Sequence, residues 1–336
     1  MNNELLLAVF AIQNPSHNIA CNNHAMSVIE KLIPKGCTVV RNKGNMLVRK
    51  GPASGPHPYF LAHMDQVHDY VPFMQLVSDS GILSARDGNG NQVGVGGDDK
   101  CGIYLALDML HRLDHCTAVF VRDEEVGCIG SGEVPLEWFD HASFVIQADR
   151  NNQTFDIIRD TNGYRCASDA FMDEMLKLPE ADNHSETSGS VTDIGELTSR
   201  GLTVSMVNIS SGYHNPHSRK ETVTLSELQI ACDLAYAAAT TLGDRRWYNK
   251  PESCWGDLAG YSGLTTGDDW SRDFEWEDYR ALGEAYPTDD ERERLISGLI
   301  DCGFDRGFDQ MDHFTTEELS EWLAESIALD DSLADA

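Results

Sequence analysis

The sequence predicts an α/β fold, a three-layer α/β/α sandwich around a mixed, mostly parallel central sheet. The first observation is a series of short, near-continuous apolar runs within residues 1–243, which are typical of strands that helices cover on both faces. The second is that segments with apolar residues at helical spacing lie between these runs, and such alternation indicates helices packed against one sheet. The third is a hydrophobic content of 41% in 336 residues, which is enough to bury a sizeable core.

The first 65 residues supply two predicted helices and three predicted strands. The helices span residues 3–12 and 24–33, where apolar side chains recur at helical spacing. The strands span residues 37–43, 45–50 and 58–65. The start of the chain lacks the basic stretch and the small-residue cleavage site of a signal peptide. We therefore expect the first helix to belong to the fold.

The following residues continue this alternation of helices and strands. A glycine-rich turn leads into a predicted amphipathic helix at 96–113, and apolar strands follow at 117–125 and 143–150. A short helix and one more strand precede the last predicted helix, at residues 166–176 and 201–209. The last helix spans 222–243, with Thr224 and Glu227 as a capping box and Gly243 as its C-terminal stop.

The composition changes after Gly243, so we expect a domain boundary between residues 1–243 and residues 244–336. The C-terminal segment holds 25 acidic against eight basic residues. This excess of acidic residues accounts for more than half of the net charge of −30. Apolar residues at helical spacing predict two helices in it, one after Thr288 and one after Thr315. We expect a small helical appendage, whose acidity is either a solvated surface or a surface for a protein partner.

Charge and composition exclude several classes of protein. A net charge of −30 argues against direct binding to nucleic acid or to anionic membranes. No run of about 18 uninterrupted apolar residues occurs, so no membrane span is expected. The nine cysteines form no CxxC pair, which favours reduced thiols and a cytoplasmic protein.

Residues of the types that bind metals lie where the predicted strands end, and this edge of an open α/β sheet is where sites are built. These residues are His63, Asp65, Asp98, Asp99, Glu124, Glu125, Asp149, His214 and His217. Each has an ordinary alternative, since Asp98 could cap the helix that follows it and His63 could be a hydrogen-bonded core histidine. Five such places along the chain favour one shared metal site.

Three consecutive carboxylates, Asp123, Glu124 and Glu125, end one of these strands. Because adjacent like charges repel, a metal, a proton or exposure to water must compensate them. We expect Asp123 to be exposed to solvent and to have no role in the site.

In order and spacing these residues resemble the two-zinc exopeptidases, a superfamily that includes peptidase T, the carboxypeptidase-G-like enzymes and related aminopeptidases. The resemblance covers residues 1–243 and rests on HMD at 63–65, GGDDKCG at 96–102, DEEVGCIGS at 123–131, QAD at 147–149 and HSRKETVTL at 217–225. It implies the zinc exopeptidase fold. Many relatives insert a lid domain before the last histidine, whereas only about forty residues separate Asp149 from SGSVTD here. We therefore expect a catalytic domain without that lid.

The resemblance also implies a role for each matching residue. One zinc ion would be bound by His63, Asp98 and Asp149, and the second by Asp98, Glu125 and His217. Asp65 would orient the His63 ring, and Glu124 would be the general base. His217 is favoured as the last ligand over His214, which either lines the pocket or lies on the surface. Ser190, Thr192 and Asp193 would lie on the substrate side, or would only form a turn and a helix cap.

The expected function is that of a di-zinc hydrolase of amide bonds, an aminopeptidase that acts on short peptides. Cobalt or manganese could substitute for zinc. Two alternatives stay open: a zinc amidohydrolase that removes acyl groups from N-acylated amino acids, and a peptidase fold that has lost catalysis and acts as an acidic binding protein. The sequence predicts neither the substrate nor the oligomeric state.

Overall fold

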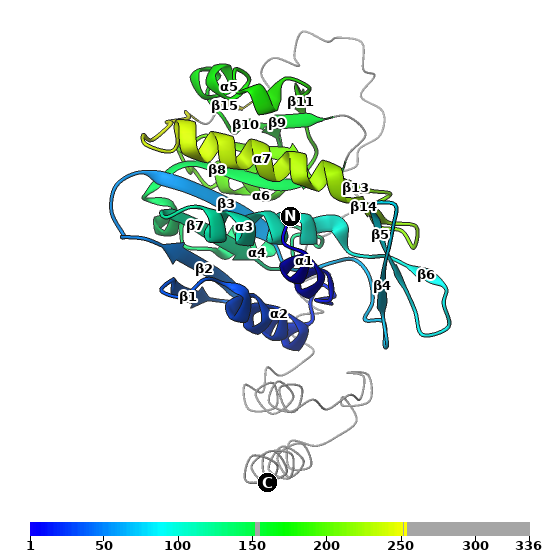
Figure 1. Ribbon diagram of the computed structural model, residues 1–336. Helices are drawn as coiled ribbons and strands as arrows, with labels where there is room; N and C mark the ends of the chain where they lie inside the picture. Colours follow the sequence, from blue (N-terminus) through cyan, green and yellow to red (C-terminus); the bar gives the residue numbers. More distant parts are fainter. Residues whose placement is uncertain (152–154, 251, 254–336) are drawn as a thin grey trace, which may run out of the picture. The chain divides into compact units, whose positions relative to one another are not determined.

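The structure is a computed structural model that describes residues 1–151, 155–250 and 252–253. They belong to one compact unit, Met1–Cys254. The predicted α/β fold, with helices on both faces of a mixed sheet, is confirmed (Figure 1). The helices predicted after Thr288 and Thr315 lie outside the described residues. Within the described residues, no helix combines the length and the apolar character that a membrane crossing requires.

Within the part of the chain that the structure describes, the main sheet has ten strands. They are β1 (Thr38–Asn42), β2 (Asn45–Lys50), β3 (His57–His63), β7 (Cys116–Val121), β8 (Ala142–Arg150), β9 (Asp156–Thr161), β10 (Tyr164–Arg165), β11 (Ser185–Ser188), β12 (Met206–Ser210) and β15 (Glu252–Ser253). Their order is β1-β2-β7-β3-β8-β12-β9-β10-β15, and β11 pairs with β9. The four central strands β7, β3, β8 and β12 are parallel, and pairing becomes antiparallel at β2 and at β9. The carboxyl ends of the parallel strands therefore meet at one edge.

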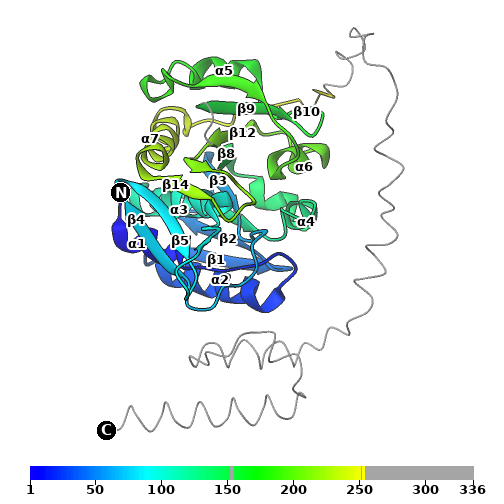
Figure 2. The ribbon, with the colours of Figure 1, turned by 90° about the vertical axis from the view of Figure 1, so that its right-hand side faces the viewer.

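Helices cover both faces of this sheet, as the side view in Figure 2 shows. One face packs against α1 (Asn3–Phe10), α2 (Ile19–Leu32), α3 (Gly97–Arg112), α5 (Asp169–Met175) and α7 (Leu225–Leu242). The other face packs against α6 (Asp193–Ser199) and a 3-10 turn at Leu136–Phe139, with α4 (Ile129–Glu133) beside them. The central strands β3 and β7 are buried along their whole length, as their continuous apolar sequences predict.

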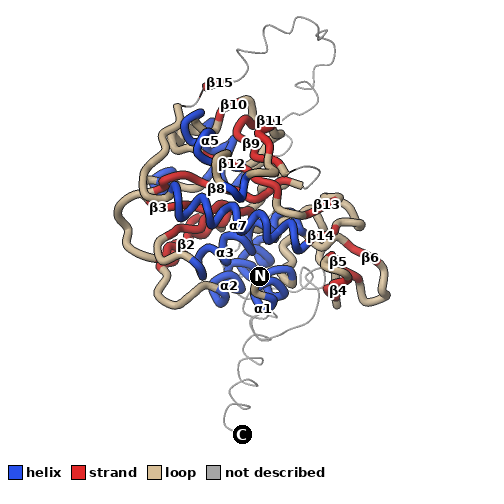
Figure 3. Tube along the Cα trace, turned by 45° about the horizontal axis from the view of Figure 1, so that its top comes forward, coloured by secondary structure: helices blue, strands red, loops and turns tan. Residues whose placement is uncertain are grey.

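A second, smaller sheet lies beside the main one (Figure 3). Its strands are β4 (Gln75–Asp79), β5 (Ile82–Arg86), β6 (Gln92–Val93), β13 (Tyr213–His214) and β14 (Thr222–Thr224). They pair in the order β13-β14-β5-β4, and β6 pairs with β5. This sheet joins the segment after β3 to the segment before α7, and so fixes both ends of the loop that contains His217.

The last helix begins where the sequence predicts but is capped differently. Thr224 is the N-cap residue of α7, yet its side chain makes no capping hydrogen bond. The carboxylate of Glu227 lies 2.7 Å from Nε2 of His214 instead of reaching back to the helix start. The predicted capping box is therefore wrong, because the carboxylate of Glu227 pairs with His214 on β13 and does not accept from the backbone at the helix start.

The residues directly after Gly243 still pack against the main sheet and its helices. Trp247 is buried, with 6% of its surface exposed. Its backbone N–H donates to Ser143 O at 2.8 Å, and its carbonyl accepts from Ser205 N–H at 2.8 Å. Its indole ring packs edge-on against Phe171 of α5. These residues lie beyond the predicted boundary at 243, which stays a prediction for the rest of the segment.

Candidate metal centre

Polar side chains from four segments converge at the carboxyl edge of the central strands. β3 ends at His63, β8 brings Asp149, and the turn after β7 brings Glu124 and Glu125. Asp98 comes from the first turn of α3, where its backbone is not yet helical. The convergence follows from the parallel pairing of β7, β3 and β8, because the ends of neighbouring parallel strands lie side by side.

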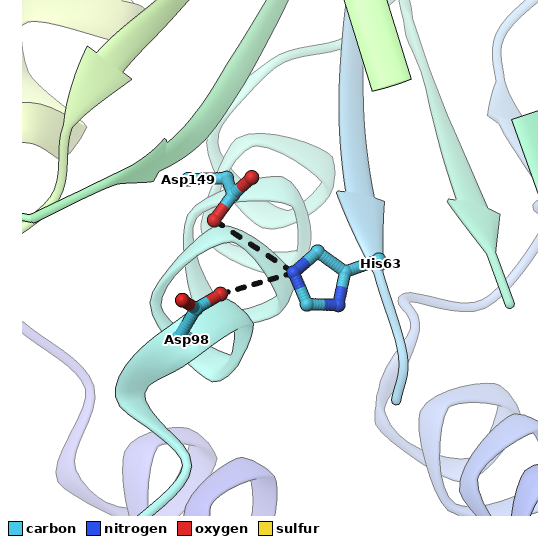
Figure 4. Close-up of side chains that lie close together, drawn as sticks. All are labelled: His63, Asp98 and Asp149. Carbon is cyan, nitrogen blue, oxygen red and sulfur yellow. Dashed lines mark hydrogen bonds and ion pairs between the residues drawn. The ribbon is translucent and has the colours of Figure 1, made fainter. Parts of the chain in front are cut away.

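The first cluster consists of His63, Asp98 and Asp149, whose ligand atoms lie within 4.8 Å of one another. Nε2 of His63 is 3.0 Å from Oδ1 of Asp98 and 3.7 Å from Oδ1 of Asp149. Figure 4 shows both carboxylates directed at the same ring nitrogen. One atom placed between these three groups would contact all of them.

The second cluster consists of Asp98, Glu125 and His217, again within 4.8 Å. Nε2 of His217 is 3.0 Å from Oε2 of Glu125 and 3.3 Å from Oδ2 of Asp98. Asp98 thus uses one carboxylate oxygen in each cluster. His214 takes no part among these contacts, since its ring pairs with Glu227 outside the cavity.

Asp65 connects the end of β3 to the turn that follows β7. Its Oδ1 accepts from the backbone N–H of Glu124 at 2.9 Å, and its Oδ2 accepts from Glu125 N–H at 3.3 Å and from Ser16 Oγ at 2.7 Å. Nδ1 of His63 lies 3.1 Å from Asp65 O and 3.4 Å from its carboxylate. One side chain therefore fixes the imidazole and the two glutamates together.

Asp123 is buried, with 7% of its surface exposed, and the expectation that solvent covers it is wrong. Its carboxylate accepts from the backbone N–H of His17 at 2.7 Å and pairs with Arg122. Its φ of +52° turns the chain sharply at this point. This turn lets Glu124 and Glu125 both line one cavity although they are adjacent in sequence.

A buried carboxylate that the sequence did not single out holds the Asp98 loop. Glu221 is fully buried and accepts from Gly96 N–H at 2.7 Å and from Asp98 N–H at 3.1 Å. Its Oε2 also lies 2.8 Å from Nε2 of His68. The pattern HSRKE, with Glu221 four residues after His217, was the available clue.

Asp99 fixes the same loop from the other side. Its carboxylate is buried and accepts from His63 N–H at 3.1 Å and from Gly102 N–H at 2.9 Å. A Cβ at Gly102 would lie 2.4 Å from Asp99 Oδ1, so the motif requires glycine there. Lys100 points into the protein, where its ammonium donates to Val95 O at 2.9 Å and burial lowers its pKa to about 8.

The cavity beside the two clusters has a volume of about 190 Å³. Ser190 and Thr192 line it, and Thr192 Oγ1 donates to Asp149 at 3.1 Å. Asp193 lies behind it, fully buried, with hydrogen bonds from Ser131 at 2.6 Å and Gln147 at 3.2 Å. Of the three residues predicted on the substrate side, Ser190 and Thr192 therefore line the cavity. Asp193 does not line it, and its carboxylate accepts a hydrogen bond from Gln147.

Burial disfavours the charged forms of several carboxylates of the site. Burial raises the pKa of Asp149 to about 8, and the charge of Asp98 adds to the shift. Burial also raises the pKa of Glu124 and of Glu125. Each shift means that the charged form of the group is disfavoured in this environment.

For the two histidines, by contrast, the site favours the charged form. Hydrogen bonds to Asp98 and Glu125 raise the pKa of His217 to about 10. Burial alone would lower the pKa of His63, but hydrogen bonds to Asp149, Asp65 and Asp98 raise it well above its usual value. The site therefore attracts positive charge strongly, and a cation between the carboxylates could replace these protons.

The donor set fits divalent metal ions. Carboxylate and imidazole ligands without a thiolate suit zinc in a hydrolytic site. Oε1 of Glu125 is buried and has no hydrogen-bond partner among the described residues. A buried carboxylate oxygen without a donor is costly, and a metal ion is one way to satisfy it. The seven cysteines of the described residues are free, and none belongs to either cluster.

No protein-family model matches the sequence, and no curated protein matches it. Solved structures do match the fold. The aminopeptidase PepT from Bacillus cereus superposes with a TM-score of 0.57 at 13% identity, covering 70% of this chain and 96% of that one. A tripeptidase from Staphylococcus aureus gives 0.55 at 14% identity, covering 72% and 99%. The TET1 peptidase from Pyrococcus horikoshii gives 0.52 at 15% identity, covering 70% and 98%.

The chain shares the fold of these three peptidases. This confirms the α/β fold that the motifs implied. Between Asp149 and Ser188, the described residues form β9, β10, α5 and β11, which join the main sheet or pack on its face. The absence of a lid domain stays a prediction.

Proposed function

We propose that this protein is a di-zinc metallohydrolase that cleaves amide bonds of short peptides as an aminopeptidase. One observation supports this more than any other. Two three-residue clusters share the carboxylate of Asp98, and all their members except the fully buried His63 line one small cavity together with Glu124. The solved structures that share the fold bear the names aminopeptidase, tripeptidase and peptidase.

The residues divide into distinct tasks. His63, Asp98 and Asp149 would hold one zinc ion, and Asp98, Glu125 and His217 the other. Bound zinc would polarise the substrate carbonyl and lower the pKa of a water molecule to about 7. Asp65 keeps the His63 ring in place through its contacts with Nδ1, and such partners fix the tautomer of a ligand histidine.

Glu124 is the proposed general base. It lines the cavity beside both clusters, yet it belongs to neither of them. Its backbone is fixed by Asp65, and Cys128 Sγ lies 3.7 Å from its Oε1. Because neither cluster uses its carboxylate, Glu124 is the residue that would take a proton from water and pass that proton to the leaving amine.

Substitution of the base separates chemistry from metal binding. Glu124→Gln should lower kcat on a short peptide by about 100- to 10,000-fold, while zinc content measured by plasma emission stays that of the unaltered protein. Glu133→Gln is the matched control, because this exposed glutamate pairs with Arg122 outside the cavity. A Glu124→Gln variant that keeps near-normal turnover would refute the mechanism.

The substrate class needs a separate measurement. Unblocked dipeptides and tripeptides should be hydrolysed, and the same sequences with an acetylated amino terminus should not. Hydrolysis of acetyl-amino acids alone would identify a deacylase instead. No hydrolysis of either class by the zinc-loaded protein would favour a fold that has lost catalysis.

A further inference from the structure

One cationic side chain in the cavity has no place in the proposed metal chemistry. Among the described residues that line the cavity, Arg150 is the one with a permanent positive charge. It follows the proposed ligand Asp149 directly, at the end of β8. In a chain with a net charge of −30, an arginine beside four cavity carboxylates requires an explanation.

The contacts of Arg150 leave part of its guanidinium available. Its Nε donates to Oδ2 of Asp156 at 3.2 Å. Asp156 is buried, with 5% of its surface exposed, and its backbone N–H donates to Ser210 Oγ at 3.0 Å, so the anchor is fixed to the sheet. An arginine that served only this carboxylate would present two parallel N–H groups to it. Here a single Nε contact is made, and the Nη groups have no hydrogen-bond partner among the described residues.

An amide side chain and several apolar side chains also line the cavity. Asn208 uses its side-chain amide on the backbone of Asp149. Ile158, Val191 and Pro216 add apolar surface. The proposed metal ions would compensate the four carboxylates, so these do not require Arg150. Its guanidinium, held through Nε by Asp156, can therefore meet a group of the substrate with its Nη atoms.

We propose that Arg150 is a specificity-determining residue that binds a carboxylate of the substrate close to the cleaved bond. The proposal rests on the proposed peptidase function of the same site. A carboxylate at this position has two sources: the side chain of an amino-terminal aspartate or glutamate, and the α-carboxylate of a dipeptide. Both would accept from the planar Nη groups, which suit carboxylate geometry.

Two matched substrate pairs test the proposal and distinguish the sources. Glutamyl-p-nitroanilide and glutaminyl-p-nitroanilide differ only in the side-chain carboxylate, and Ala-Ala and Ala-Ala-amide differ only in the α-carboxylate. Arg150→Met should lower kcat/KM for the carboxylate member of one pair by about 10- to 100-fold. The amide member should change by less than about threefold. The affected pair identifies the source of the carboxylate.

Controls separate recognition from folding. Arg150→Lys keeps the charge without the planar fork and should lose part of the discrimination. Arg150→Met with Asp156→Asn removes the buried partner together with the arginine, so that no unpaired charge remains. Arg159→Met alters an arginine that pairs with Asp169 and Glu186 away from the cavity and should leave all four rates unchanged.

The outcomes for this inference and for the proposed function differ. If all substrates are cleaved and Arg150→Met slows both members of each pair equally, or neither, Arg150 has no role in specificity while the peptidase function stands. If no substrate is cleaved, the peptidase function fails, and calorimetric binding of L-glutamate against L-glutamine and of Ala-Ala against Ala-Ala-amide decides the role of Arg150. Loss of carboxylate preference in Arg150→Met supports it, and equal binding by both proteins overturns it.

Discussion

His57 and His63 lie at the two ends of the same strand, β3, and their exposed fractions are 1% and 0%. Burial lowers the pKa of His57 to about 4, whereas carboxylate partners raise the pKa of His63 well above its usual value. His57 contacts neutral groups, the carbonyl of Gly55 at 3.1 Å and the hydroxyl of Thr117 at 2.9 Å. Burial is thus the same at both ends, and the charge of the partners decides the protonation state.

This difference distinguishes a structural histidine from a candidate ligand. The neighbouring titratable groups that help to lower the pKa of His57 are all basic: His115, which stacks on it at 3.9 Å, His141 and Arg49. No carboxylate acts on it among the described residues that shift its pKa. Carboxylates surround His63 at the carboxyl edge of the sheet, whereas other histidines lie beside His57 at the opposite edge.

The largest effect should come from removing Asp98, the carboxylate that the two candidate metal clusters share. Asp98→Asn should lower kcat/KM by about 1,000-fold or more, which corresponds to several kcal/mol of transition-state stabilisation. Zinc content should fall, and the pKa of His63 in the metal-free protein should move toward that of His57 in an NMR titration. Asp108→Asn, on α3 with Arg112 as its partner, is the control. Full zinc content with normal activity would contradict the assignment of Asp98.

An intermediate effect is expected when the Asp98 loop loses its support. Glu221→Gln keeps the shape of the side chain but removes the charge that accepts from Gly96 and Asp98. Zinc affinity, measured by competition with a chelator, should fall by about 10- to 100-fold. Glu227→Gln, whose carboxylate pairs with half-exposed His214, should change affinity little. Equal losses in the two variants would mean that Glu221 has no specific role.

The smallest effect concerns the other end of β3. Because the folded-state pKa of His57 lies below the unfolded value, its contribution to stability is full above about pH 6.5 and is lost as the pH falls toward about 4. We expect this loss to be about 2 kcal/mol between pH 7.5 and pH 4.5. In urea unfolding, the stability difference between the unaltered protein and His57→Gln should shift by that amount in favour of the variant. A difference independent of pH would show that His57 titrates alike in both states.

The sequence predicts the strands that form the centre of this site, because buried strands have continuous runs of apolar residues. β3, β7 and β8 were predicted within a few residues, and their parallel pairing brings His63, Asp149 and the glutamates together. That each of them binds a metal stays a prediction. Strands β4, β5 and β6 of the smaller sheet were not predicted. β4 and β6 are short and mostly exposed, so they lack the continuous apolar run of a buried strand.

Contacts between distant segments account for what the sequence could not predict. Asp123 is buried because the loop that precedes α2 covers it, and nothing within its own strand indicates that loop. Glu221 meets Gly96 across 125 residues of sequence. Such partners depend on how two sheets lie together, which local periodicity does not encode.

The contacts of Trp247 determine where this chain can be truncated. Composition changes at Gly243, but a protein truncated there would lose the backbone partners of Ser143 and Ser205. It would also leave Phe171 without the indole ring that packs against it. Buried polar groups without partners and an uncovered aromatic surface both destabilise a fold. A stable fragment should therefore end after Trp247 and its backbone partners, and not at Gly243, where acidic residues begin to dominate.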